Sequence, residues 1–599
     1  MTKKILNLII SLAVSLFLVA VSLYSLNNSS STPQQIDQAT ETPYPLAPAL
    51  LNEVPDIDDL PFQDNFNIYQ YDDPDSVVVL YITVRMGNSS DKTNYTWAEV
   101  NSFNKWVNGS RSANIEVGKA DAIVQVGDEN GPVPGELGYE AVVPNATIQI
   151  RGASSSAMPQ KSYKIELYKN GGQWRGQSTI ALNKHIFDLS RVRNKLAIDL
   201  SKQIPNMVSL RTQFIHLFVR DQTVDPNNSA FEDYGLFTQI EQVNRTFLKN
   251  HLLDPNAHLY KATSFEFYRY PDQFRLADDP LYNEDEFSHR LEIKGDHDHS
   301  KLLQMLDDIN NYDLQIGPSF EKYFDEDNYF TWLAFNILMG NVDTQNQNFY
   351  LYSPLNSHKW YFIPWDYDDS LFRFDREELG EYSYQHFESG IANYWGSVLH
   401  KRVLREKAYR QKLDSKIKGL LEFLTPERIQ EMLNLYQPIV KPYAFRLPDL
   451  TYLPGSRNEF DHLYAVIPSE IQNNYNLYLE SLTTPMPFYL DTPTVESNSL
   501  SFDWDDAYDF SGQDIIYTFE VSTDVDFKDS KKIVAQTSLT NVTDFQMEML
   551  KQGIYYWRVI ATNQMEKTQH AFDTYFDSNS NPHDGVKSFA ITENGQVIE

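Results

Sequence analysis

The chain has 599 residues, 41% of them hydrophobic and 14% aromatic, which excludes a wholly disordered polymer and suits two or three folded domains. The formal net charge of −32 repels nucleic acid and anionic lipid, so neither is expected as a partner of the bulk of the surface. The chain has no cysteine, which excludes disulfides, thiolate metal sites and cysteine nucleophiles.

Residues 1–26 are predicted to form an export signal. Lys3 and Lys4 precede an apolar run that continues to Leu26, and Asn and Ser residues follow it. This order is typical of a secretory signal peptide, but about 20 apolar residues also suffice for an uncleaved anchor. Both readings predict a secreted or envelope-tethered protein that touches the membrane only through this segment.

Residues 27–75 are rich in Ser, Thr, Pro, Asn and Asp and end in an acidic stretch. Such a composition buries little apolar surface, so we expect an acidic and polar linker. Ordered structure is predicted from residue 76 onward, because the run VVVLYITVRM is β-branched and apolar enough for a buried strand.

Two patterns divide residues 76–482. Up to about residue 300, short apolar runs predict strands at 120–126, 146–152, 161–168, 214–220 and 235–243. From about residue 325 the pattern is helical, and it includes a nearly all-apolar helix that begins at Asp325 or Asp327 and ends near Gly340. This order predicts an α+β body with a β-rich lobe, a helical lobe and a cleft between them.

A proline-rich stretch at 483–495 ends this body. Short alternating strands follow at the spacing of a β-sandwich, so residues 486–599 are predicted to form a small all-β sandwich domain. Its WD and YYWRVIA segments resemble a fibronectin type III-like domain, with Trp504 and Trp557 in the core. We expect a spacer or docking module.

The run GNVDTQNQNFYLYSPLNSHKWYFIPWDYDDS at 340–370 carries the clearest chemical signal. It reads as a loop, a strand, a polar turn and a second strand, so Asp366 should return to the hairpin end where Asp343 and Asn348 lie. Phosphoryl transfer needs a carboxylate to accept the proton of the attacking hydroxyl and hard oxygen ligands for Mg²⁺ or Mn²⁺. Asp343 and Asn348 are five residues apart, which matches the spacing of the catalytic Asp and the metal-binding Asn in protein kinases.

Several other readings of this run are weaker. Asp and Asn are common in turns for purely local reasons, and the spacing differs from that of an EF-hand. Two carboxylates would also suit a glycosidase, which has no role for the Asn or for a lysine-bearing hairpin. His297, Asp298 and His299 suggest a metal site, but a solvated loop explains them better because no further ligand is evident.

A second hairpin is predicted over IQIRGASSSAMPQKSYKIEL at 148–167. Its Gly/Ser-rich turn offers N–H and hydroxyl groups to phosphate oxygens, and a strand lysine adds a positive charge. Lys161 and Lys164 are three residues apart and face opposite sides of the strand, so only one of them can serve. An ordinary surface hairpin has the same composition.

These segments resemble the spore coat protein H (CotH) kinase family. The resemblance rests on RGASSSAMPQKSYKIEL, SRVRNKLAIDL, YGLFTQIEQVNRTFL, LYKA and LMGNVDTQNQNFYLY…KWYFIPWDYDDSL, in the family's order across residues 76–480. It implies an atypical bilobed protein-kinase-like fold at 76–482 and transfer of phosphate from ATP to Ser or Thr of extracellular or envelope proteins. The acidic surface suits a basic or Ser-rich protein substrate, or serves solubility alone.

The resemblance also implies roles for single residues. It assigns the catalytic base to Asp343 and the metal to Asn348 and Asp366, with Asp368 as a further ligand or as a group behind the ligands. The nucleotide would be bound by Arg151, Gly152, Ser154, Ser155 and Lys161, and Glu241 would reach the nucleotide side of the cleft. The acidic partner of Lys161 is left open among Asp199, Glu241 and Glu292. The alternative to an enzyme is a non-catalytic surface protein in which a pseudokinase body binds a partner protein.

Overall fold

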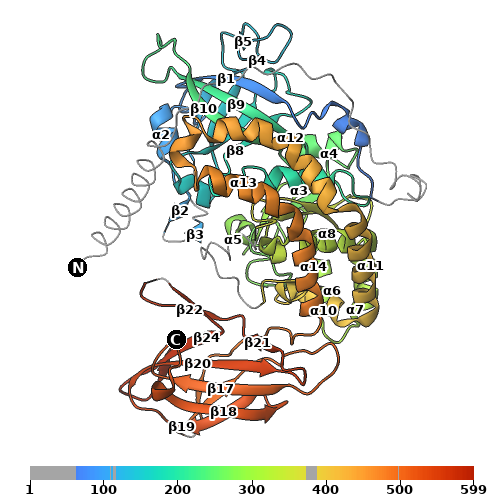
Figure 1. Ribbon diagram of the computed structural model, residues 1–599, viewed down its shortest axis with the longest axis vertical. Coiled ribbons are helices and arrows are strands. Elements are labelled where there is room, and N and C mark those ends of the chain that lie inside the picture. Colours follow the sequence, from blue (N-terminus) through green and yellow to red (C-terminus); the bar gives the residue numbers. More distant parts are fainter. Residues whose placement is uncertain are drawn as a thin grey trace. The chain divides into compact units, whose positions relative to one another are not determined.

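The computed structural model describes residues 62–107, 110–111, 117–372, 387–496, 498–579 and 581–598 (Figure 1). The predicted export signal at 1–26 lies outside these residues, as does most of the predicted linker. The chain divides into two compact units. Unit 1 combines Met1–Pro255 with Ile429–Ala465, and unit 2 combines Asn256–Arg428 with Val466–Glu599.

Unit 1 is built on one closed sheet. Its strands are β1 (Val77–Arg85), β4 (Ala120–Asp128), β5 (Gly131–Pro132), β6 (Ala146–Arg151), β7 (Ser162–Leu167), β8 (Thr179–Asn183), β9 (Thr212–Asp221) and β10 (Glu232–Glu241). They are ordered β1-β9-β10-β8-β7-β6-β4-β5, and a further antiparallel pairing of β1 with β4 closes the sheet into a ring. Since β1 and β4 pair with each other, neither leaves a long open edge, and the enclosed side chains form one core.

The strands predicted from the short apolar runs are confirmed as β4, β6, β7, β9 and β10. The closure of the sheet was not predicted, because it depends on the pairing of β1 with β4, more than 35 residues later in the chain. Unit 1 also contains β2 (Trp106–Val107), β3 (Ser110–Arg111), α2 (Trp97–Ser102), α3 (Arg193–Ser201), α4 (Arg245–Asn250) and the short 3-10 helices η2 (Phe66–Tyr71) and η3 (Ser154–Ala157).

Part of the predicted linker is folded. Phe62 is buried, and η2 follows it. Asp64 accepts hydrogen bonds from the Tyr69 hydroxyl and from the backbone N–H of Ser209, and it contacts His251 at 2.5 Å. Residues 62–75 therefore belong to the folded unit, because their polar side chains find buried partners far away in the sequence.

Two late helices complete unit 1. They are α12 (Pro426–Ala444), which joins unit 1 from Ile429, and α13 (Arg457–Val466), with η6 (Asp449–Tyr452) between them. In Figure 1, α12 and α13 are the orange helices beside the strands of unit 1. A buried ion pair of 2.6 Å joins Asp449 of η6 to Lys184, the residue after β8, and so connects this late segment to the sheet. The division of the body therefore differs from the predicted boundary near residue 300.

Unit 2 begins with helices around a small antiparallel sheet. The sheet has the order β12-β11-β13-β14, with β11 (His258–Ala262), β12 (Leu291–Ile293), β13 (Phe349–Ser353) and β14 (Tyr361–Pro364). The helices are α5 (Glu284–Arg290), α6 (Ser300–Asn310), α7 (Ile316–Tyr323), α8 (Glu326–Met339), α10 (Val398–Arg405), α11 (Lys407–Phe423) and α14 (Glu470–Ser481), with η4 (Val342–Gln345), η5 (Ala392–Tyr394) and η7 (Ile467–Ser469).

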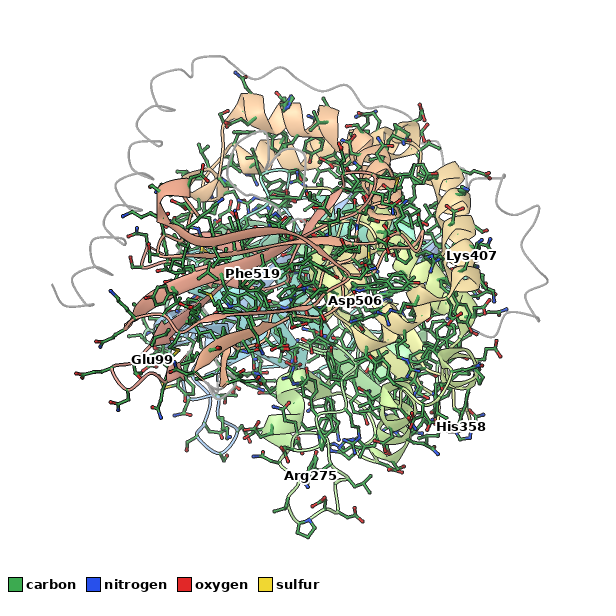
Figure 2. The ribbon with its side chains drawn as sticks, turned by 90° about the horizontal axis from the view of Figure 1, so that it is seen from below. Glu99, Arg275, His358, Lys407, Asp506 and Phe519 are labelled. Atoms are coloured by element: carbon green, nitrogen blue, oxygen red, sulfur yellow. The ribbon has the colours of Figure 1, made fainter. Side chains whose placement is uncertain are left out.

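An all-β region ends unit 2. One sheet has the order β15-β16-β19, and the other has β18-β17-β20-β24-β25 with β21 on β20. Trp504 and Trp557 are buried in the core, as predicted, and Phe519 of β17 lies among these strands (Figure 2). The strand bounds are β15 (Thr494–Glu496), β16 (Ser499–Asp503), β17 (Ile516–Ser522), β18 (Lys532–Thr540), β19 (Asp544–Glu548), β20 (Gly553–Thr562), β21 (Thr568–His570), β22 (Thr574–Phe576), β23 (Pro582–Asp584), β24 (Val586–Ile591) and β25 (Val597–Ile598), with the short 3-10 helix η8 (Asp529–Lys531) before β18.

The structure confirms the α+β class, with a β-rich region, a helical region and a C-terminal all-β region. The resemblance of the last region to fibronectin type III stays a prediction. Among the described residues, no helix has the length and apolar character needed to span a membrane.

Candidate active site

The helix that leads to the candidate site is α8, and it begins and ends as predicted. The Asp325 side chain caps it by accepting a hydrogen bond from the backbone N–H of Asn328 at 2.8 Å. Gly340 ends it with a left-handed φ of 62°, which glycine adopts without steric cost. A Cβ at Gly340 would lie 2.6 Å from the amide nitrogen of Asn474, so the close packing also requires glycine.

Asp343 lies on η4, immediately after this helix, and the loop around it is held on one side by η5. The Thr344 hydroxyl donates to the backbone oxygen of Asn341 at 2.7 Å. That leaves the Tyr394 hydroxyl to donate to Thr344 Oγ1 at 2.8 Å. The Asn393 side-chain amide donates to the backbone oxygen of Val342 at 3.0 Å. Both neighbours of Asp343 in the chain are therefore held by hydrogen bonds from η5.

The predicted hairpin is confirmed by β13 and β14. Phe349 pairs with Pro364, so Asn348 before β13 and Asp366 after β14 lie at the same end of the hairpin. Asn348 has a φ of 59° and Asp366 a φ of 56°. Left-handed backbone is uncommon for residues other than glycine, and such conformations concentrate at functional sites.

A hydrogen bond joins the two parts of this arrangement. The Asn341 side-chain amide donates to the backbone oxygen of Asp366 at 3.1 Å, which ties the start of the Asp343 loop to the end of the hairpin. Asp343, Asn348 and Asp366 are half-buried, whereas Asp368 is exposed in the following turn. The structure thus brings Asp343, Asn348 and Asp366 to one end of a hairpin and places Asp368 at its solvent side.

The donor chemistry of this set fits a hard divalent cation. Carboxylate and amide oxygens are the ligands that Mg²⁺ takes in phosphoryl-transfer sites. Within the described ranges, no group of three or more His, Cys, Asp or Glu side chains is arranged to hold a metal ion. Asp343, Asn348 and Asp366 are not such a group, because they supply two carboxylates and one amide. Substrate phosphates commonly complete a metal site of this kind.

The second predicted hairpin is formed by β6 and β7 in unit 1. Arg151 pairs with Ser162, and the turn between them contains Gly152 and the short helix η3 with Ser154 and Ser155. Gly152 has a φ of 83°, and a Cβ there would lie 2.1 Å from Ser155 Oγ, so this turn requires glycine.

The structure distinguishes Lys161, just before β7, from Lys164 within it. Lys161 donates from Nζ to the backbone oxygen of Ser156 at 2.6 Å, so its ammonium lies at the Ser-rich turn. Partial burial lowers the pKa of Lys161 below its usual value. Lys164 instead forms a partly exposed ion pair with Glu166 at 2.6 Å. The hairpin therefore gathers Arg151, Gly152, Ser154, Ser155 and Lys161 at one end, as predicted, and leaves Lys164 apart.

Glu241 is placed differently from the expectation. Its carboxylate is buried, with Oε1 2.5 Å from Arg211 Nη2 and Oε2 3.3 Å from His251 Nε2. Glu241 of β10 pairs with Ile180 of β8, which pairs in turn with Ile165 of β7. Ile165 is four residues from Lys161, which is about 13 Å in an extended chain. Burial alone would raise the pKa of Glu241, but His251 and Arg211 outweigh it and lower the pKa to about 2. Its carboxylate is held inside the fold, away from the Ser-rich turn, so its role toward the nucleotide stays a prediction.

None of the three acidic residues considered as partners of Lys161 forms an ion pair with it among the described residues. Asp199 is paired with Lys195 at 2.8 Å and with Lys202 at 2.7 Å. Glu292 lies 2.9 Å from Lys294. Each carboxylate thus has a cation of its own. The partners of Asp199 and Glu292 lie within four residues in the chain, whereas Arg211 is brought to Glu241 across 30 residues by the fold.

The placement of His299 differs from the prediction. The loop at 297–299 was predicted to be solvated, but His299 is fully buried. Its Nδ1 lies 2.9 Å from the Tyr260 hydroxyl and its Nε2 lies 3.2 Å from the Tyr282 hydroxyl. Burial lowers the pKa of His299 to about 4, which favours the neutral ring. The ring is a core element held by two tyrosines.

The residues that support the Asp343 loop were not found from the sequence. Asn341 stands next to the predicted helix end, but its partner Asp366 is 25 residues away. Asn393 contacts Val342 across 51 residues. An Asn in a loop has many local uses, so no pattern separates these two from ordinary turn residues.

Comparison with known proteins gives two matches. The family model described as CotH kinase protein matches residues 148–478, which is more than half of the chain. The inner spore coat protein H of Bacillus subtilis (strain 168) is 24% identical over 349 residues, covering 58% of this chain and 89% of that protein.

Proposed function

The chain belongs to the CotH kinase protein family, and from this premise we propose that it is a metal-dependent protein kinase that transfers the γ-phosphate of ATP to Ser or Thr hydroxyls of other proteins. The observation that carries the proposal is the joining of Asp343, Asn348 and Asp366 at one hairpin end, with the last two in left-handed backbone.

Each residue has a separate role in this proposal. Asp343 accepts the proton of the attacking hydroxyl, which a half-buried carboxylate on a fixed loop can do. Asn348 and Asp366 supply oxygens to Mg²⁺ or Mn²⁺, and the exposed Asp368 is a further ligand or a group behind them. The metal, when bound, neutralises charge on the transferred phosphates.

The hairpin turn of unit 1 would hold nucleotide phosphates. This proposal is supported by the position of the Lys161 ammonium, which lies at the same end of β6 and β7 as Ser154, Ser155 and the left-handed Gly152. Lys161 carries no paired carboxylate among the described residues, so its positive charge is available to a phosphate. Arg151 would add a second cation at the same end.

We also propose that the protein is exported. The predicted signal at 1–26 supports this, and so does the similarity to a protein named as part of an inner spore coat. The acceptor would be a protein of the extracellular face, and the net charge of −32 favours a basic one.

The test is phosphate transfer by the full-length protein with γ-labelled ATP, Mg²⁺ or Mn²⁺, and a Ser/Lys-rich acceptor protein. Asp343→Ala and Asp366→Ala should each lower transfer by about 10²–10⁴-fold, the range expected for a positioned proton acceptor or its equivalent in the site. Asp503→Ala, which removes an exposed carboxylate from β16, is the matched control and should leave transfer unchanged.

Two outcomes would decide against catalysis. Absence of both transfer and self-labelling with either metal would refute the kinase proposal. Metal-dependent ATP binding without transfer would instead support the alternative, a surface protein that uses a pseudokinase body to bind a partner.

A further inference from the structure

A small polar cavity lies behind the Asp343 loop in unit 2. It has a volume of about 20 Å³ and is lined by residues of α8, the Asp343 loop, η5 and α14. Four of the lining residues are asparagines that are almost fully buried: Asn474, and a group of three, Asn336, Asn341 and Asn393, on α8, the Asp343 loop and η5.

The orientation of each of these three amides is determined by its neighbours. Asn336 donates from Nδ2 to the backbone oxygen of Trp332 at 2.8 Å. Asn341 and Asn393 donate from Nδ2 to the backbone oxygens of Asp366 and Val342 at 3.1 Å and 3.0 Å. A carbonyl oxygen cannot donate, so a flipped amide would lose its bond in every case.

The three side-chain oxygens are consequently acceptors that lack a hydrogen-bond partner among the described residues. Buried polar atoms are nearly always satisfied in folded proteins, by protein groups or by ordered water. A fourth asparagine of the lining, Asn474, uses one N–H for the backbone oxygen of Leu338 and has a second N–H to offer.

We infer that this cavity binds one ordered water molecule, which bridges α8, the Asp343 loop and η5 and so positions the candidate catalytic loop. A water needs roughly 10–15 Å³ and two to four polar partners, and both conditions are met. Its two O–H groups serve two of the asparagine oxygens at a time, and the Asn474 amide donates to it.

A metal ion is the competing guest, since Glu388 also lines the cavity. Hard divalent cations take about six or more oxygen ligands, whereas the three neutral amide oxygens here are accompanied by an N–H donor that a cation would repel. The set of groups therefore matches the donor and acceptor capacity of water. The positioning role rests on the proposed kinase function, but occupancy of the cavity does not.

The first experiment is a high-resolution crystal structure of the full-length protein, with separate soaks in thallium and manganese salts. The expected result is one density peak at hydrogen-bond distance from at least two of the three asparagine oxygens, without anomalous signal in either soak. An empty cavity or an anomalous peak would overturn the inference.

The second experiment displaces the water and leaves all asparagines in place. Leu477 lines the cavity on α14, so Leu477→Phe should fill it, and Leu479→Phe on the exposed side of the same helix is the control. Amide hydrogen exchange of residues 341–346 should accelerate about tenfold in Leu477→Phe, as for loss of one buried hydrogen-bonded bridge. The kcat for phosphate transfer should fall with it, while the KM for ATP stays unchanged.

Each outcome has one meaning. Exchange and kcat equal in Leu477→Phe and Leu479→Phe would refute the positioning role. If the wild-type protein transfers no phosphate, the kinase proposal fails, while density and exchange still decide whether the water is there. Should Leu477→Phe not fold, Asn336→Ala removes one of the three oxygens and none of the direct side-chain bonds to the loop, and it must accelerate exchange of the same residues.

Discussion

The stability of unit 1 should depend on pH through His251. This residue is fully buried, with Nδ1 2.5 Å from Asp64 and Nε2 3.3 Å from Glu241. Burial alone would lower its pKa, but the two carboxylates outweigh that effect and raise the pKa from 6.5 to about 9. The imidazolium is therefore the form that the folded state prefers.

The magnitude follows from linkage. A pKa unit corresponds to about 1.36 kcal/mol, so a rise from 6.5 to about 9 stabilises the folded state by about 3 kcal/mol. Because the folded pKa lies above the unfolded one, this contribution is fully present below pH 6.5. It is lost as the pH rises from about 6.5 through about 9.

The assay is urea unfolding of the wild type and of His251→Gln at about pH 6, 7.5 and 9, followed by tryptophan fluorescence. The variant should be less stable at pH 6, and the difference should shrink toward pH 9. His289→Gln, an exposed histidine of α5, is the control and should follow the wild type. Equal pH dependence of the free energy of unfolding in His251→Gln and wild type would refute the reasoning.

Three further substitutions test the fold and the site. Lys184→Met leaves Asp449 buried without its cation and should lower the free energy of unfolding by about 3–5 kcal/mol in urea denaturation, whereas the double variant with Asp449→Leu should recover much of the loss; no recovery would contradict the pairing. Gly152→Ala forces a Cβ against Ser155 Oγ at a φ of 83° and should raise the KM for ATP, with a strain of about 1–2 kcal/mol in the turn; an unchanged KM would remove the turn from the nucleotide site. Gly340→Ala adds a Cβ at a φ of 62° against the Asn474 amide of α14. It should lower the melting temperature through a loss of at least about 1 kcal/mol, and an unchanged melting temperature would show that the helix end can shift to accept the Cβ.

Local pattern was sufficient for much of the candidate site. The all-apolar run with Asp325 before it and Gly340 after it determined α8, because capping and the glycine stop are properties of neighbouring residues. The hairpin β13–β14 followed from two apolar runs with a polar turn between them, and its geometry alone places Asn348 and Asp366 at one end. The same reasoning gave the Ser-rich turn and Lys161.

Contacts across long sequence separations could not be obtained in that way. The resemblance placed Glu241 toward the nucleotide, and only the fold shows that Arg211 and His251 enclose its carboxylate. The segment with Asp64 had the composition of a linker, but buried partners elsewhere in unit 1 hold it in place. The composition of a segment predicts its average burial, but it does not predict which distant residue a given side chain will pair with.

The sequence by itself determined which residue types stand at which spacing: Asp343 and Asn348 five apart, Asp366 beyond a hairpin, and Lys161 after a Ser-rich turn. Only the tertiary structure decided how these residues are supported, through the bond from Asn341 to Asp366 and the bond from Asn393 to Val342. The physical reason is that turns and caps depend on neighbours in the chain, whereas a buried polar group is satisfied by whichever group the fold brings beside it.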